Sequence, residues 1–151
     1  MTIIYLDADA CPVKDETYRV AGRYEHLTKV VTNDWLRVPE SPLIELVLVE
    51  QGLDRADDWI AEQAGPGDVV VTADIPLAHR CVTAGARVLA PTGRAFTEAS
   101  IGNDLATRNL LTDLREAGTI QGGGRPFTKQ DRSAYLNALD AALQAIKRLG
   151  R

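Results

Sequence analysis

A series of short apolar runs rich in β-branched residues, most of them separated by stretches with helical character, constrains the fold most. The runs lie at residues 2–6, 28–32, 43–49, 69–73 and 86–90. The first and the fourth are continuously apolar over several positions, which is typical of strands buried on both faces. Strands that alternate with helices predict a mainly parallel sheet covered on both sides. We therefore expect an α/β protein, a three-layer α/β/α sandwich with a central sheet of about five strands.

The expected helices lie between these runs. One begins at Pro12, a second covers residues 53–64, and a third runs from Pro76 to Gly85. Proline is tolerated in the first turn of a helix, and glycine commonly follows the last turn. Only residues 33–42 separate the second and third runs, which is too short for a helical crossover. The third strand is therefore either antiparallel or joined by an unusual loop, and the sequence leaves its direction open.

The chain changes character after residue 93. Residues 103–117 have helical character, the glycines at 122–124 interrupt the chain, and residues 128–149 form a long amphipathic pattern. Thr128 is the expected N-cap of this last helix, with Asp131 near the position of a capping box. We expect a C-terminal helical extension within a single domain that spans residues 1–151.

Composition narrows the class of protein. The chain has 151 residues, 45% of them hydrophobic, and two cysteines, which excludes a disulfide scaffold and a four-cysteine zinc site. No apolar run approaches the roughly 20 residues that span a bilayer. Because Met1–Leu6 lacks a basic leader, we expect a cytoplasmic protein that does not bind membranes.

The charges are unevenly distributed. Residues 1–75 carry 15 acidic and 6 basic side chains, whereas residues 76–151 carry 6 and 11. This pattern fits an acidic cation site beside a basic anion-binding surface, and equally two solvated faces of opposite charge.

Acidic residues at strand ends are the main chemical signal. Asp7 and Asp9 follow the first strand, and Asp74 follows the fourth. Ligands of parallel sheets collect at the carboxyl ends of the strands, and several carboxylates there would bind Mg²⁺ or Mn²⁺. Capping of nearby helices is the other interpretation, and it accounts less well for three acids than for one.

The helix expected at residues 53–64 offers a fourth acid. With 100° per residue and Ile60 at the centre of the packed face, Asp57 lies at the edge of that face and Asp58 points outward. We therefore expect Asp57 to join the cation site as a metal ligand and Asp58 to be solvated.

Three other residues have weaker signals. Lys14 and Arg132 are candidates for substrate phosphate contacts, and Arg132 stands in the first turn of a helix, where anions are favoured. Cys11 stands at a helix start, where the pKa of a thiol can fall.

Four ordered motifs resemble the YaiI/YqxD family of uncharacterised bacterial proteins. They are residues 7–14 (DADACPVK), 52–60 (GLDRADDWI), 67–78 (GDVVVTADIPLA) and 122–127 (GGGRPF) with Asp131 and Arg132. The family is grouped with PIN-like domains, many of which are Mg²⁺- or Mn²⁺-dependent ribonucleases. The resemblance implies a PIN-like fold in which Asp7 and Asp74 match the strand-end acids and Asp57 stands near the acid carried by the intervening helix.

Three functions remain open from the sequence. The leading hypothesis is a divalent-metal-dependent nuclease acting on RNA, with Asp7, Asp9, Asp57 and Asp74 as catalytic metal ligands. A second is a non-catalytic module that binds RNA or a protein. A third is a phosphatase of the haloacid-dehalogenase type, in which Asp7 is the nucleophile.

Overall fold

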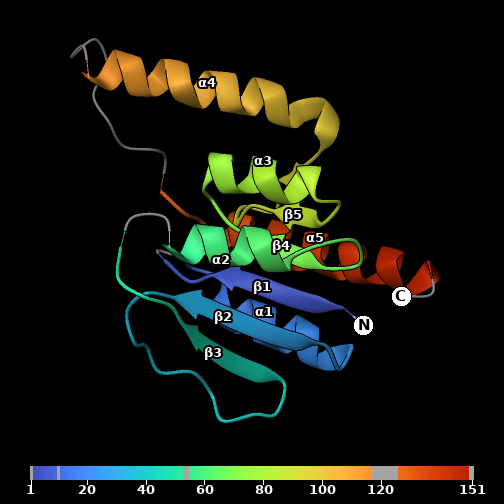
Figure 1. The fold of residues 1–151 in the computed structure, drawn as a ribbon. Coiled ribbons are helices and arrows are strands. Elements are labelled where there is room, and N and C mark those ends of the chain that lie inside the picture. Colours follow the sequence, from blue (N-terminus) through green and yellow to red (C-terminus); the bar gives the residue numbers. More distant parts are fainter. Residues whose placement is uncertain (1, 10, 53–54, 117–125, 150–151) are drawn as a thin grey trace.

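The computed structural model describes residues 2–9, 11–52, 55–116 and 126–149. Strands and helices alternate through most of the chain (Figure 1). In chain order they are β1 (Ile3–Asp7), α1 (Lys14–Arg23), β2 (Leu27–Thr32), β3 (Ile44–Leu48), α2 (Arg55–Gln63), β4 (Val69–Val71), α3 (Ile75–Thr83), β5 (Arg87–Leu89), β6 (Ala95–Phe96), α4 (Glu98–Glu116) and α5 (Lys129–Arg148).

The sheet has the strand order β3-β2-β1-β4-β5-β6. The first five strands in this order are mutually parallel, and β6 pairs antiparallel with β5. The five expected strands and the mainly parallel sheet are confirmed, and β6 is an addition. The carboxyl ends of β1, β2 and β4 consequently meet at one edge of the sheet.

The connection from β2 to β3 resolves the question that the sequence left open. The two strands are parallel, with Thr28 opposite Ile44, and residues 33–43 link them without a helix. The link must return from the end of β2 to the start of β3, a distance of about the length of β2. Eleven extended residues reach about 36 Å, which is enough to cover this distance without a helix. Leu36 and Val38 of this segment pack against the core, where a crossover helix would otherwise lie.

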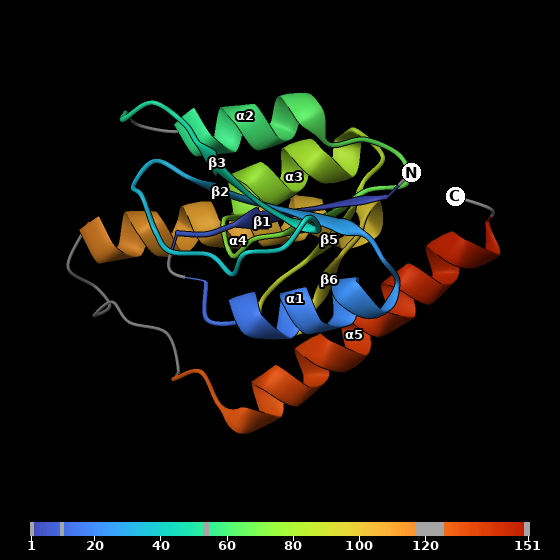
Figure 2. The ribbon, with the colours of Figure 1, turned by 90° about the horizontal axis from the view of Figure 1, so that it is seen from below.

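Two layers of helices cover the sheet, as expected for the three-layer sandwich (Figure 2). Ile4 and Leu6 of β1 face a cluster that includes side chains from α1 and α5. Tyr5, between them in sequence, faces the opposite cluster with side chains from α2, α3 and α4. This alternation follows from the two-residue period of a strand, and it explains why the first run is apolar throughout.

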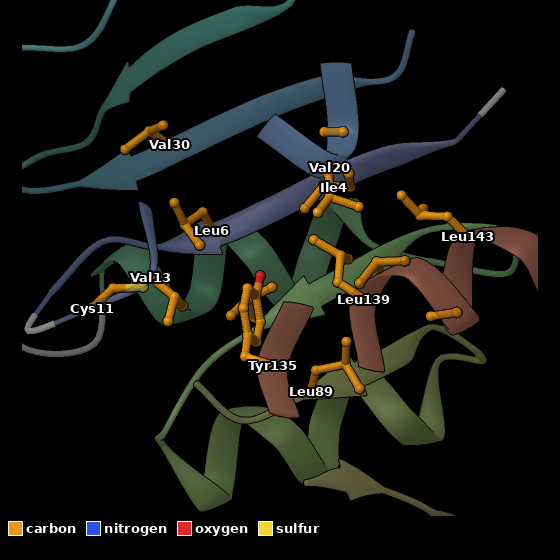
Figure 3. Packing of buried hydrophobic residues seen from close by; sticks show 14 of the residues in the cluster. Ile4, Leu6, Cys11, Val13, Val20, Val30, Leu89, Tyr135, Leu139 and Leu143 are labelled. Atoms are coloured by element: carbon orange, nitrogen blue, oxygen red, sulfur yellow. The ribbon is translucent and has the colours of Figure 1, made fainter. Parts of the chain in front are cut away.

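The last helix is tied to the sheet and to α1. Thr128 and Asp131 form the expected capping box, and α5 begins at Lys129. Tyr135 is fully buried among the aliphatic side chains of the cluster (Figure 3), and its hydroxyl lies 2.6 Å from the hydroxyl of Thr17 on α1. The glycines at 122–124 lie outside the described residues.

Candidate functional site

Asp7 and Asp74 are linked by a buried threonine at the carboxyl edge of the sheet. Asp7 is the last residue of β1, and its Oδ2 accepts a hydrogen bond of 2.8 Å from the hydroxyl of Thr72. The same hydroxyl oxygen accepts a 3.0 Å hydrogen bond from the backbone N–H of Asp74. Thr72 is 1% exposed and follows β4, which pairs directly with β1. Strand pairing thus brings together two acids that are 67 residues apart.

Asp74 also caps α3. Its Oδ1 accepts a hydrogen bond of 3.0 Å from the backbone N–H of Leu77, and its backbone is extended, as is usual at an N-cap. The capping interpretation is therefore correct for this acid. It does not exclude the cation site, because Asp74 also lines the pocket described next.

One pocket at this edge of the sheet contains all four acids that the sequence singled out. Its volume is about 320 Å³, and it lies between the ends of β1 and β2, the start of α2 and the turn before α3. The polar residues that line it are Asp7, Asp9, Thr32, Asn33, Arg55, Asp57 and Asp74.

Helical geometry distinguishes the two neighbouring acids of α2 as expected. Asp57 is half-buried and lines the pocket. Asp58 is about half exposed and forms an ion pair of 2.7 Å with Arg80 of α3. One residue of rotation, about 100°, separates a pocket acid from a surface acid.

The pocket concentrates negative charge around Asp7. Burial raises the pKa of Asp7 above its ordinary value, and the nearby carboxylates of Asp74 and Asp9 raise it further. The hydrogen bond from Thr72 acts in the opposite direction and stabilises the ionised form. The ionised carboxylate of Asp7 is therefore destabilised in the folded protein, and a bound cation would offset that effect.

The arrangement limits how a metal ion would be held. Within the described residues, no group of three or more Asp, Glu, His or Cys side chains is placed to hold a metal ion. Mg²⁺ usually keeps several water ligands and uses one or two carboxylates together with substrate phosphates. An ion of this kind would need only Asp7 and one neighbouring acid as direct ligands, and substrate oxygens would complete its coordination.

The two basic residues selected from the sequence lie elsewhere. The Nζ of Lys14 donates a 2.9 Å hydrogen bond to the carbonyl of Cys11. Arg132 donates hydrogen bonds of 2.7 Å to the carbonyl of Pro12 and to a carboxylate oxygen of Glu16. Neither Lys14 nor Arg132 lines the pocket, and Arg132 connects α5 to the start of α1.

Three polar residues of the pocket were missed by the sequence reasoning: Thr32, Asn33 and Arg55. Arg55 is exposed at the first turn of α2, and Asn33 follows β2 directly. Both positions carried a usable signal, because Arg55 precedes Asp57 on one helix and Asn33 stands at a strand end, like Asp7 and Asp74.

The cysteines do not form a reactive site. Burial raises the pKa of the Cys11 thiol, which reverses the expectation of a lowered pKa at this helix start. Cys81 is fully buried in α3, as expected for a small core residue, and burial raises its pKa to about 11. Both thiols are therefore protonated near neutral pH.

Fold and site together define the class of protein: a three-layer α/β protein with an acidic pocket at the carboxyl ends of its parallel strands. The sequence model described as the uncharacterised YaiI/YqxD family matches residues 5–145. The chain belongs to this family.

Relatives with high identity cover nearly the whole chain. A UPF0178 protein of Rhodopseudomonas palustris (strain BisB18) is 60% identical over 147 residues, which are 97% of this chain and 95% of that protein. A UPF0178 protein of Bradyrhizobium diazoefficiens is 61% identical over 97% of this chain and 88% of its own length. A UPF0178 protein of Nitrobacter winogradskyi is 59% identical over 96% and 92%. No solved structure gives a significant match.

The fold contains no candidate for a membrane span in its described part. None of the helices in residues 2–9, 11–52, 55–116 and 126–149 combines the length and the apolar character that crossing a bilayer requires.

Proposed function

We propose that this protein is a divalent-metal-dependent nuclease that hydrolyses phosphodiester bonds, with RNA as its substrate. One observation carries the proposal: four carboxylates line a single pocket at the carboxyl edge of a parallel sheet, with the half-buried Asp7 beside the charges of Asp9 and Asp74. Such a concentration of carboxylates favours the binding of a cation there.

The residues of the pocket divide into two roles. Asp7, Asp9, Asp57 and Asp74 would hold Mg²⁺ or Mn²⁺ as catalytic metal ligands. A bound ion of this kind activates water for attack and offsets charge on the phosphate. Thr72 orients the Asp7 carboxylate through its 2.8 Å hydrogen bond.

Arg55 and Asn33 would contact the substrate phosphate. Both line the pocket, and the guanidinium group of arginine matches phosphate geometry with several N–H donors. The role that the sequence assigned to Lys14 and Arg132 would then be restricted to substrate segments outside the pocket.

A cleavage assay tests the proposal directly. The purified protein is incubated with varied RNA and DNA strands in Mn²⁺, Mg²⁺ or EDTA, beside the variants Asp7→Asn and Asp58→Asn. We expect cleavage that needs the divalent ion and falls at least about 100-fold in Asp7→Asn, since a metal ligand supplies several kcal/mol of transition-state stabilisation.

Asp58→Asn is the matched control, because Asp58 carries the same charge one residue beyond Asp57 but pairs with Arg80 on the surface. This variant should cleave like the wild type. Absence of divalent-dependent cleavage across the substrates, or full cleavage by Asp7→Asn, would refute the proposal.

A non-catalytic nucleic-acid-binding module is the second candidate. The absence of a ready-made three-ligand metal group among the described residues favours it. Nucleic-acid binding that survives Asp7→Asn, without any cleavage, would support this module over the nuclease.

The phosphatase alternative receives less support. Asp68, the other acid beside β4, precedes the strand, and its two oxygens accept backbone hydrogen bonds from Ile3 and Gly65. This acid is therefore engaged at the opposite edge of the sheet from Asp7. A phosphorylated aspartate at position 7 would revive the phosphatase.

A further inference from the structure

Trp35 is unusually exposed for its size. Its exposed fraction is 72%, against 66% for Leu149 and 56% for Leu48, the other large apolar side chains that are exposed in the described part of the chain. Tryptophan carries a large apolar surface that is normally mostly buried. An indole so exposed to solvent therefore indicates a surface that binds a ligand or a partner.

Trp35 lies next to the acidic pocket. It follows the pocket residue Asn33 by two positions, so at most about 7 Å of extended chain separates their Cα atoms. The segment that carries it leaves the end of β2 and returns along the sheet to β3 (Figure 1).

Exposure alternates along this segment. Trp35 and Arg37 are exposed, whereas Leu36 and Val38 are partly buried against the α1 and α5 side of the core. An extended chain places alternate side chains on opposite sides, so Trp35 and Arg37 share the outward side. The inward pair fixes the segment, and the outward pair presents an aromatic ring and a cation to solvent.

Hydrogen bonds fix the start of the segment as well. The amide nitrogen of Gln51 donates to the carbonyl of Asn33 and to the carboxylate of Asp34, both at 2.6 Å. The hydroxyl of Thr32 donates to the carbonyl of Asp34 at 2.8 Å. The backbone before Trp35 is thus held by the side chains of Gln51 and Thr32, which lowers the entropy lost when a ligand binds there.

The second tryptophan shows the contrast. Trp59 on α2 packs edge-on against the ring of Tyr5, at 6.0 Å between centroids, and lies under the ammonium group of Lys29. Trp59 therefore has a structural environment inside the protein, whereas the large exposed face of Trp35 is directed to solvent.

We infer that Trp35, together with Arg37 and Arg55, binds unpaired bases of a single-stranded nucleic acid whose backbone enters the acidic pocket. The inference deepens the proposed function and rests on it for the identity of the ligand. An exposed aromatic ring stacks on any base, and neighbouring arginines attract the phosphates. Bases within a duplex already stack on one another, so a single aromatic ring of this kind selects unpaired strands.

The test measures binding without cleavage. In a Trp59→Phe background, Trp35 is the one remaining tryptophan, because the chain contains two. A single-stranded RNA oligonucleotide added at low salt with Ca²⁺, which binds oxygen ligands and offsets the charge of the pocket, should quench its fluorescence. Anisotropy of a dye-labelled oligonucleotide then gives the affinity of each variant.

We expect Trp35→Ala to weaken single-strand binding by about tenfold or more, as for loss of one stacked base. Trp35→Phe should retain most of the affinity, because it preserves an aromatic face. Leu149→Ala is the matched control, since it removes a similarly exposed apolar side chain at the end of α5 and should bind like the parent. The duplex of the same sequence should bind more weakly than the single strand.

Several outcomes would overturn the inference. One is an unchanged single-strand affinity in Trp35→Ala, which would indicate that Trp35 contacts a protein partner instead. The others are an equal loss of affinity in Trp35→Phe and Trp35→Ala, and the absence of fluorescence quenching by any single strand. Failure of the nuclease is distinguishable: quenching and Trp35-dependent binding without divalent-dependent cleavage would remove the enzyme and retain this binding surface.

Discussion

The amino and carboxyl edges of the sheet place an aspartate in opposite electrostatic environments. At the amino edge, Asp68 accepts one 3.1 Å hydrogen bond on each carboxylate oxygen, from the backbone of Ile3 and of Gly65. At the carboxyl edge, Asp7 accepts a hydrogen bond from Thr72 and is exposed to the charges of Asp9 and Asp74. The first acid stabilises the fold, and the second is destabilised by its surroundings.

This difference separates acids that hold a structure from acids available to a ligand. A carboxylate with backbone donors on both oxygens has its charge stabilised by the protein itself. A carboxylate that faces other carboxylates leaves a field that attracts cations. Four predictions test the contrast, from the largest expected effect to the smallest.

The first prediction tests whether the carboxyl edge is tightly packed away from the acidic pocket. Gly93 lies at this edge, in the turn after β5, with φ of 91°, and a Cβ there would stand 2.6 Å from the backbone of Ala134 on α5. Gly93→Ala should therefore lower the free energy of unfolding by about 3 kcal/mol or more, through steric overlap and backbone strain. Urea denaturation measures it.

Gly102→Ala is the control for Gly93→Ala. Gly102 lies in α4, and an added Cβ there meets no atom within 4 Å. This substitution should be neutral or stabilise the protein by up to about 1 kcal/mol. Equal free energies of unfolding for the two variants would mean that the backbone near Gly93 adjusts to an added Cβ. The carboxyl edge would then be poorly packed outside the acidic pocket as well.

The second prediction concerns the amino edge. Asp68→Asn places an amide N–H against one of two backbone N–H donors, so it should lower the free energy of unfolding by about 2 kcal/mol. Glu62→Gln, on the exposed side of α2, should change it by less than about 0.5 kcal/mol. Urea titrations of both variants give the comparison, and a neutral Asp68→Asn would contradict the structural role.

The third prediction concerns the carboxyl edge. Asp7→Asn keeps an oxygen that accepts from Thr72 and removes the repulsion with Asp9 and Asp74. In metal-free buffer the variant should melt at or above the wild-type temperature. Mn²⁺ should raise the Tm of the wild type and leave that of the variant unchanged. A loss of stability as large as that of Asp68→Asn would break the comparison.

The fourth and smallest effect is the pH dependence of that difference. Because the folded pKa of Asp7 lies above its ordinary value of 3.8, the wild type loses stability as pH rises through the folded pKa. The stability gap between Asp7→Asn and the wild type should vanish at acidic pH below both pKa values and grow toward neutrality. Thermal melts across this range, without metal, measure it, and a gap independent of pH would exclude the titration of Asp7 as its cause.

Much of the fold was predictable because local patterns decide it. The apolar runs marked the five parallel strands, and the capping signal of Thr128 and Asp131 marked the start of α5. Two features had no local signal. The two residues of β6 are too few to show a period, and the parallel direction of β3 depends on a segment that packs without a helix.

The site was predictable to the extent that it follows from strand ends. Asp7 ends a strand, Asp9 and Asp74 follow strands, and the helical period selected Asp57 over Asp58. The sequence did not predict the positions of Lys14 and Arg132 relative to the pocket. Charge and nearness to a helix start do not determine which group a long side chain binds. Arg132 finds Glu16, and Arg55 occupies the pocket instead.

The sequence by itself determined the layers, the parallel strands and the acids at their ends, because periodicity and capping act between residues close in the chain. The tertiary structure alone decided that β1 and β4 are neighbours, that Thr72 joins Asp7 to Asp74, and that Trp35 is exposed beside the pocket. These features depend on strand order and on side-chain packing between distant segments, and a linear pattern does not contain that information.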